Sequence, residues 1–222
     1  MDSINNQPNS YELALQSVGE IIKQYDSSGM FPAFGFGAKI NQIVSHHFPL
    51  NGNENHPYCS SLEELLNFYR DNVRKVTLWG PTNFSPVINS TASIANQYQD
   101  GGRHYFILLI ITDGIITDQL QTKRAIINHP SESPLSIVIV GVGEADFSAM
   151  DELDADEVPL TADGKILQRD ILQFVPMNRF LSKGGSHIQA KYQLAQELLY
   201  EVPDQITSYM KHKGFRPATK SD

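Results

Sequence analysis

The residues best placed to do chemistry stand at the end of one long apolar run. Residues 105–114 read Tyr-Phe-Ile-Leu-Leu-Ile-Ile-Thr-Asp-Gly, so Thr112 and Asp113 supply a hydroxyl and a carboxylate just after it. An unbroken apolar run is typical of a strand covered on both faces, as in a parallel sheet between helices. Ligands of such sheets bind beyond the carboxyl ends of the strands. Thr112 and Asp113 are therefore the first candidates, although Asp and Gly are also common in simple turns.

Two other clusters invite a metal-binding interpretation. Residues 144–157 are dense in carboxylates but lack the glycine and the ligand spacing of a calcium loop, which favours a solvated acidic face. His46, His47, His56 and Cys59 lie close together in the sequence. Their spacing fits no common zinc module, and neighbouring side chains on a strand point to opposite faces.

Motifs of catalysis and nucleotide binding are weak. The sequence has no Gly-x-Ser-x-Gly elbow for a nucleophilic serine. Gly141-Val142-Gly143 follows an apolar run but lacks the third glycine of the dinucleotide fingerprint. These glycines are expected to mark a close backbone approach at a strand end.

Composition narrows the class of protein. The chain has 222 residues, enough for one well-buried α/β domain, and its 41% hydrophobic and 19% charged residues suit a globular protein. A formal net charge of -8 argues against charge-driven nucleic-acid binding and is compatible with cation binding. The single cysteine, Cys59, excludes an internal disulfide and favours a reducing, intracellular location. No apolar stretch is long enough to span a membrane, and residues 1–8 do not resemble a signal peptide.

Apolar spacing predicts alternating helices and strands, which indicates an α/β fold with a mainly parallel sheet. Strands are expected at 30–36, 44–50, 75–79, 105–114, 134–143 and 171–176. Helices are expected at 11–25 with Ser10 as cap, 62–73 capped by Ser60 and Ser61, 86–99, 118–128, 145–153 and 188–213 with a bend at Pro203. The core is expected to include Trp79 and the phenylalanines Phe31, Phe34, Phe36 and Phe84.

Several long strings of the sequence carry a resemblance to a known family. They are residues 30–39 (Met-Phe-Pro-Ala-Phe-Gly-Phe-Gly-Ala-Lys), 44–51, 80–89, 108–118, 136–143, 169–176 and 201–210. Together they closely resemble the carboxy-terminal A domain of copines, a branch of the von Willebrand factor A fold, from about residue 11 to residue 217.

The resemblance implies a doubly wound, mainly parallel sheet between helices. In domain terms, it implies a disordered lead at 1–9, a copine-type A domain at 10–213 and a flexible tail at 214–222. A metal-ion-dependent adhesion site, usually filled by Mg2+ or Mn2+, lies at the carboxyl edge of the sheet in this fold. Three loops build it, and two of them correspond here to Thr82 in Gly-Pro-Thr and Asp113 in Thr-Asp-Gly.

The sequence departs from the family at the first of those loops. The Asp-x-Ser/Thr-x-Ser motif and its strand are absent, which implies a fragment, a truncated isoform or a partial gene model. Thr82 and Asp113 alone offer one neutral and one anionic oxygen, too few to hold Mg2+ firmly against water. The missing strand belongs in the middle of the sheet. Its neighbours are expected either to close up on each other or to destabilise the domain.

The resemblance also implies a function. This chain resembles copines, which are cytosolic, calcium-dependent phospholipid-binding proteins. Their Ca2+ sites lie in two C-two domains that are absent from this chain. Their A domain recruits target proteins. The expectation is a non-enzymatic protein-interaction domain that binds intracellular proteins, in signalling or trafficking. Phospholipid contact and calcium-dependent recruitment to the plasma membrane would belong to the full-length family member.

Two alternatives remain open at this point. Some plant ubiquitin ligases carry a copine-like domain beside a zinc RING. Cys59 alone cannot build a RING, so this chain would be at most a substrate-recruiting part. The second alternative is a direct phospholipid-binding module that uses the basic residues Lys211, Lys213, Arg216 and Lys220, a group that is more often simply solvated.

Overall fold

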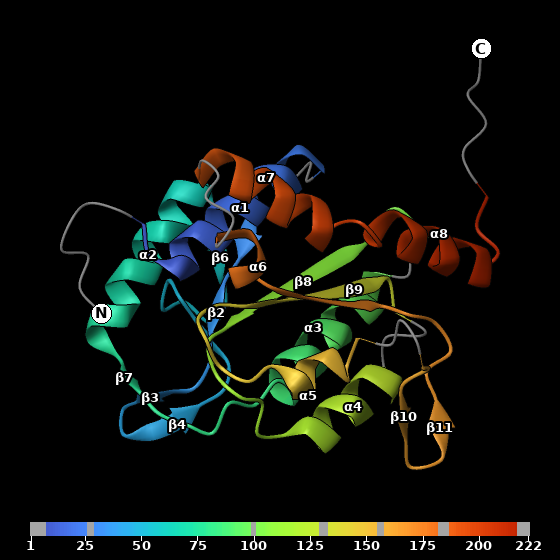
Figure 1. The fold of residues 1–222 in the computed structure, drawn as a ribbon, viewed down its shortest axis with the longest axis horizontal. Helices are drawn as coiled ribbons and strands as arrows, with labels where there is room; N and C mark the ends of the chain where they lie inside the picture. The colour runs from blue at the N-terminus through green and yellow to red at the C-terminus, as the bar shows by residue number, and fades with distance from the viewer. Residues whose placement is uncertain are drawn as a thin grey trace.

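The centre of the protein is a three-stranded parallel sheet. In the computed structural model the strand order is β12 (Leu172–Pro176), β9 (Leu135–Gly141), β8 (Phe106–Thr112). Helices lie above and below this sheet in Figure 1, which confirms the α/β class and the mainly parallel sheet. The structure describes residues 8–25, 29–98, 101–128, 133–154, 158–181 and 187–216.

The apolar strands β8 and β9 divide their side chains between two cores. On one face, Ile137 and Ile139 pack with α3 (Ser85–Ala95), α4 (Gln119–Asn128) and α5 (Ser148–Asp151). On the other face, Val138 and Val140 pack with α1 (Ser10–Tyr25), α7 (His187–Leu198) and the start of α8 (Val202–His212). All seven residues of β9 are buried, as expected for a strand that has helices on both faces.

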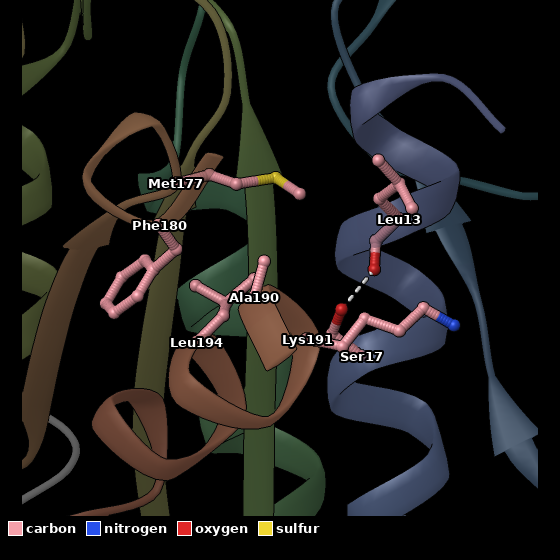
Figure 2. Close-up of a pocket in the computed structure, with 7 residues that line it drawn as sticks. All are labelled: Leu13, Ser17, Met177, Phe180, Ala190, Lys191 and Leu194. Atoms are coloured by element: carbon pink, nitrogen blue, oxygen red, sulfur yellow. Dashed lines mark hydrogen bonds between the residues drawn. The ribbon is translucent and has the colours of Figure 1, made fainter. Parts of the chain in front are cut away.

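The seam between α1 and α7 is tightly packed. Figure 2 shows Leu13 and Ser17 of α1 beside Ala190, Lys191 and Leu194 of α7, with Met177 and Phe180 closing one end. The cavity between these residues is only about 10 Å³, which is no more than one water molecule occupies. This seam is therefore a packing contact and not a ligand pocket.

The segment between α1 and α2 (Leu62–Lys75) folds into short antiparallel strands, and one further strand follows α2. They are β1 (Phe31–Pro32) with β6 (Tyr58–Cys59), β2 (Phe34–Gly35) with β5 (Phe48–Pro49), and β4 (Ile43–Ser45), β3 (Ala38–Ile40) and β7 (Thr77–Leu78) in that order. The expected single strand at 44–50 is wrong, because His46 and His47 separate β4 from β5. The expected strand at 30–36 is likewise split at Ala33, and β3 was not foreseen. Asn41 and Gln42 join β3 to β4 with positive φ values of 50° and 67°, the geometry of a tight two-residue hairpin.

Two helix starts test the capping predictions. Ser61 caps α2 (Leu62–Lys75) and accepts a bond of 3.1 Å from the Glu64 N–H, as expected. Ser10, however, is not the cap of α1. Asn9 Oδ1 accepts from the Glu12 N–H at 2.9 Å, and Glu12 Oε2 accepts from the Asn9 N–H at 2.9 Å, so these two residues form a reciprocal capping box. The last residue of the expected lead is thus a helix cap, whereas residues 1–7 lie outside the described part.

The carboxy-terminal helix was predicted as one bent helix at 188–213, and this is wrong. The structure has two helices, α7 and α8, because Pro203 stands in the first turn of α8, where proline begins a helix rather than bending one. Phe215, in the expected flexible tail, packs edge-on against Tyr209 with ring centroids 6.2 Å apart. Residues 217–222 lie outside the described part.

The remaining differences are smaller. The helix expected at 145–153 covers only Ser148–Asp151, because Asp146 accepts the Ser148 N–H and fixes a later start. A hairpin of β10 (Thr161–Ala162) and β11 (Lys165–Ile166), the short α6 (Asn178–Leu181) and a 3-10 turn at Asn96–Tyr98 were not predicted. The expected close approach is confirmed at Gly141, where a Cβ would lie 3.0 Å from the Phe147 ring. It is wrong at Gly143, where a Cβ would meet nothing within 4 Å and the glycine instead has a positive φ of 87°.

The outer side of β8 tests the expectation that the neighbours of the missing strand close up on each other. Within the part of the chain that the structure describes, β8 pairs only with β9, and no other strand has closed up against it. Trp79 was expected in the core and is instead 52% exposed. It lies on the small β3–β7 sheet, where the Lys39 ammonium sits 3.1 Å from its ring centroid. Phe84 is fully buried as predicted.

Candidate functional site

Two loops meet at the carboxyl end of β8. One precedes α3 and carries Thr82, and the other follows β8 and carries Asp113. The Thr117 N–H donates to the Thr82 carbonyl at 2.8 Å, and the Thr82 N–H donates to Thr117 Oγ1 at 3.1 Å. A Cβ placed on Gly114, next to Asp113, would lie 3.4 Å from Thr82 Oγ1. The structure thus brings together the two loops that the sequence analysis singled out.

Asp118 holds these loops in place and was not foreseen as a site residue. It is 8% exposed, and its two carboxylate oxygens each accept a backbone N–H at 2.9 Å, from Phe84 and from Ser85. Thr122 Oγ1 donates to the same carboxylate at 3.0 Å. Asp118 therefore caps the amino terminus of α3 from another loop, and this positions Thr82.

The Asp113 side chain faces α1. It is exposed at the surface and lies close to the Tyr11 hydroxyl. The Tyr11 ring stacks with Tyr69 at a centroid distance of 6.0 Å, and Asn9 Nδ2 donates to the Tyr69 hydroxyl at 3.4 Å. Burial is the main cause that raises the pKa of Tyr11, and the negative charge of Asp113 raises it further. Burial is also the main reason the pKa of Tyr69 is raised. Asp113 therefore lies beside a neutral phenol.

The donors at this edge do not fit a resident Mg2+ or Mn2+ ion. Thr82 offers a neutral hydroxyl, and Asp113, which lies beside the neutral phenol of Tyr11, is the one carboxylate of the pair. Thr112 is 2% exposed, and its Oγ1 accepts from the Gly114 N–H at 3.4 Å, so it turns back into its own loop. Among the described residues, no three His, Cys, Asp or Glu side chains come together in a group that could hold a metal ion. Mg2+ requires near-ideal octahedral coordination by oxygen, and Thr82 and Asp113 supply at most two of the six ligands.

The histidine and cysteine cluster and the acidic segment, the other two candidate metal sites, make packing, ion-pair and hydrogen-bond contacts. The His47 ring stacks on Phe34 at 4.1 Å, where burial lowers the pKa of His47. Cys59 is fully buried in a small apolar cluster, and burial raises the pKa of its thiol to about 11. In the acidic segment, Glu152 pairs with Lys123 at 3.1 Å, and Asp154 Oδ2 accepts the Phe174 N–H of β12 at 3.0 Å.

Replacing Tyr11 with phenylalanine should change how stability depends on alkaline pH. The pKa of Tyr11 in the folded protein lies above its ordinary value of 10.0, so its stabilising effect is complete below about pH 10 and declines above it. We expect the free energy of unfolding of the parent protein to fall as the pH rises past 10 and the fall to be shallower in Tyr11→Phe. Urea unfolding between about pH 8 and about pH 11 measures both slopes. Tyr192→Phe, at a 69% exposed tyrosine, is the matched control. If the free energy of unfolding fell equally steeply with pH in Tyr11→Phe and in the parent, the raised pKa of Tyr11 would be contradicted.

Apolar side chains are exposed on both loops of this edge. Trp79, just before the Thr82 loop, is 52% exposed, and Ile115, just after Asp113, is 58% exposed. Leu78 and Leu120 lie close by in the sequence and are 69% and 49% exposed. Tryptophan and large aliphatic residues at a surface edge are typical of a protein contact.

Comparison with known proteins identifies the family that this chain resembles. The family model described as Copine matches residues 1–218. Proteins named Nicotinic receptor-associated protein 1 from Caenorhabditis elegans and from Caenorhabditis briggsae are each 47% identical to the chain, over 98% and 96% of its residues. The chain spans only 35% and 34% of the lengths of these relatives. In the part of the chain that the structure describes, no helix is long and apolar enough to cross a membrane.

Proposed function

Because the chain belongs to the copine family, we propose that it acts as a non-enzymatic domain that recruits target proteins. The observation that carries this proposal is the exposed apolar pair Trp79 and Ile115 on the two loops around Thr82 and Asp113. The hydrogen bonds between Thr82 and Thr117 hold these loops together, and we propose that Trp79 and Ile115 belong to one contact surface. Preorganised aromatic and aliphatic anchors commonly dominate protein interfaces.

The relatives suggest a partner. They are named for association with a nicotinic receptor, and they are 47% identical to this chain over almost its whole length. We propose that this chain also associates with a nicotinic receptor and does so through Trp79 and Ile115. The receptor would meet it on the intracellular side, since the family is expected in the cytoplasm.

Co-precipitation tests this association. The affinity-tagged chain is expected to retain nicotinic receptor from detergent-solubilised membranes, and Trp79→Ala combined with Ile115→Ser should reduce the retained receptor at least about tenfold. Tyr192→Ala combined with Tyr200→Ala is the matched control, because these exposed residues lie in α7 and just after it and belong to neither loop. Equal retention by the loop variant and the parent would exclude this contact surface. No retention by the parent would exclude the receptor as partner.

We further propose that Thr82 and Asp113 do not form a firm metal site in this chain. Isothermal titration with Mg2+ or Mn2+ is expected to show no saturable binding up to about 1 mM, because the two oxygen donors cannot replace the water shell of the ion. Asp113→Ala should behave like the parent. Micromolar binding that is lost in Asp113→Ala would contradict the proposal.

We propose that membrane contact depends on parts of copine-family proteins outside the region that matches residues 1–218. The chain is therefore expected to stay in the supernatant when it is sedimented with anionic liposomes, with or without Ca2+. In the full-length family member, Ca2+ would recruit the domain and its bound targets to the plasma membrane. Sedimentation of the chain that is lost on replacing Lys211 and Lys213 at the end of α8 would instead favour direct phospholipid binding.

A further inference from the structure

The two stretches of sequence that build the sheet around Trp79 contain no acidic residue. All 25 aspartate and glutamate residues of the chain lie outside residues 27–53 and 72–99. These two stretches contain the three strands of the β4–β3–β7 sheet. They carry three cations, which are Lys39, Arg74 and Lys75. The small sheet is therefore a locally basic part of a protein whose formal net charge is -8.

Lys39 is held in a fixed place on this sheet. Its ammonium lies 3.1 Å from the centroid of the Trp79 ring, close enough for a cation–π interaction. Lys75 forms an ion pair with Asp71 at 3.7 Å. Within the described residues, neither Lys39 nor Arg74 forms an ion pair with a carboxylate. Two of the three cations are thus available to an anion, and an aromatic ring already orders one of them.

The face of the sheet that carries Lys39 also offers apolar contacts. Lys39 is paired with Val44 of β4 on one side and with Thr77 of β7 on the other. The Trp79 N–H donates to the Gly37 carbonyl at 2.8 Å, which continues the pairing of β7 with β3. Side chains alternate between the faces of a strand, so Val44, Lys39 and Trp79 share one face. Trp79 is exposed there, and this face can contact an anion and an apolar side chain together.

The number of charges indicates what kind of anion fits. Segments that bind anionic lipid surfaces carry about four to eight lysines and arginines, more than this sheet supplies. The net charge of -8 also opposes the approach of a membrane or a nucleic acid, because their charge extends over a large area. A short acidic segment of a protein needs to touch only this one face. Charge complementarity therefore favours an acidic segment as the occupant.

We propose that this face of the β4–β3–β7 sheet binds a short segment of a partner protein in which a glutamate or aspartate stands next to a large apolar residue. The carboxylate would pair with the Lys39 ammonium, Arg74 would add attraction, and the apolar side chain would pack on Trp79. Because the Trp79 ring already orders Lys39, binding costs little side-chain entropy at this lysine. The inference rests on the proposed role of Trp79 as a contact residue and adds the chemistry of the partner.

Trp79 can report this binding, because it is the only tryptophan of the chain. The probes are three synthetic peptides with phenylalanine and leucine at the same positions and with glutamate, glutamine or lysine at all others. The glutamate peptide is expected to move the Trp79 fluorescence to shorter wavelength and to saturate at a concentration at least about fivefold lower than the glutamine peptide. The lysine peptide should bind more weakly than either. Raising the ionic strength from about 0.05 M to about 0.5 M should remove most of the preference for glutamate.

Variants of the protein locate the charge. Lys39→Met keeps the aliphatic stem and removes the ammonium, so the glutamate and glutamine peptides should bind this variant with nearly equal affinity. Arg74→Gln should reduce the preference for glutamate by a smaller factor, about twofold. Lys165→Met is the matched control, because Lys165 is exposed on β11, which lies at the opposite end of the molecule from β3 and β4 in Figure 1. It should leave the preference unchanged.

Three results would overturn the proposal. The first is no saturable shift with the glutamate peptide, including a shift seen only with vesicles that contain phosphatidylserine, which would favour a membrane instead. The second is equal binding of the glutamate and glutamine peptides by the parent, which would leave Trp79 as a purely apolar contact. The third is an undiminished preference for glutamate in Lys39→Met. The proposed function is tested separately by the retention of the receptor, so its failure is distinguishable from all three.

Discussion

Asp118→Ala is expected to lower the free energy of unfolding by about 2–4 kcal/mol. The carboxylate is buried and accepts the N–H groups of Phe84 and Ser85, which begin α3. Without it, these two donors and the Thr122 hydroxyl lose their acceptor in a place where water has little access. Urea unfolding followed by far-UV circular dichroism measures the loss. Asp118→Asn keeps only one oxygen acceptor and should fall between the parent and the alanine variant.

Asp146→Ala is the matched control for that variant. Asp146 also accepts a helix-start N–H, from Ser148 at 3.0 Å, but it does so at the exposed start of the short α5. We expect a loss of less than about 1 kcal/mol there. If Asp118→Ala cost no more than Asp146→Ala, the interloop cap would not be a significant support of the Thr82 loop.

Arg169→Ala is expected to be at least as damaging, at about 3–5 kcal/mol. Arg169 is 7% exposed, and its guanidinium donates to the carbonyls of Ser133 and Leu135 at 3.2 and 3.4 Å. It also donates to the Gln205 carbonyl at 2.9 Å and to the Tyr105 hydroxyl at 3.3 Å. One side chain therefore ties the starts of β8 and β9 to α8, and its removal leaves several buried acceptors and a cavity.

Lysine cannot restore this arrangement. A single ammonium group does not reproduce the planar fork of a guanidinium, so Arg169→Lys is expected to recover only part of the lost stability. Arg124→Ala is the control, because Arg124 makes a bidentate pair with Asp163 at 2.7 and 3.0 Å on the exposed surface. Exposed pairs contribute about 1 kcal/mol or less. Similar losses for Arg169→Ala and Arg124→Ala would contradict the structural role of Arg169.

The sequence predicted those parts of the fold that depend on local pattern. The apolar runs of β8 and β9 identified two strands of the parallel sheet, and Ser61 with Glu64 identified the start of α2. The meeting of the Thr82 and Asp113 loops came from the family resemblance. The loop contacts agree with it, since parallel strands and their following helices bring such loops to one edge.

Features that depend on distant residues were not predictable in the same way. Nothing near Asp113 in the sequence indicates that Tyr11 would lie beside it, because their proximity depends on where α1 docks. Asp118 looked like an ordinary helix start, and its role as a cap for α3 appears only in three dimensions. Trp79 was placed in the core by its residue type, whereas its small sheet leaves it exposed beside Lys39.

The order of the central strands has a consequence for how the molecule opens. β8, β9 and β12 are neighbours in the sheet and also follow one another along the chain, so one continuous stretch, residues 106–176, contains the whole parallel sheet. Among the described residues, the amino-terminal strands share no sheet with it. Phe36 connects them to the core that contains Ile137 and Ile139, and it packs edge-on against Phe84 at the start of α3. Native-state hydrogen exchange should therefore detect two cooperative units, with the amino-terminal hairpins opening at a lower free energy than the 106–176 unit. Partial unfolding would then release the hairpins while the strand that ends at Asp113 stays folded.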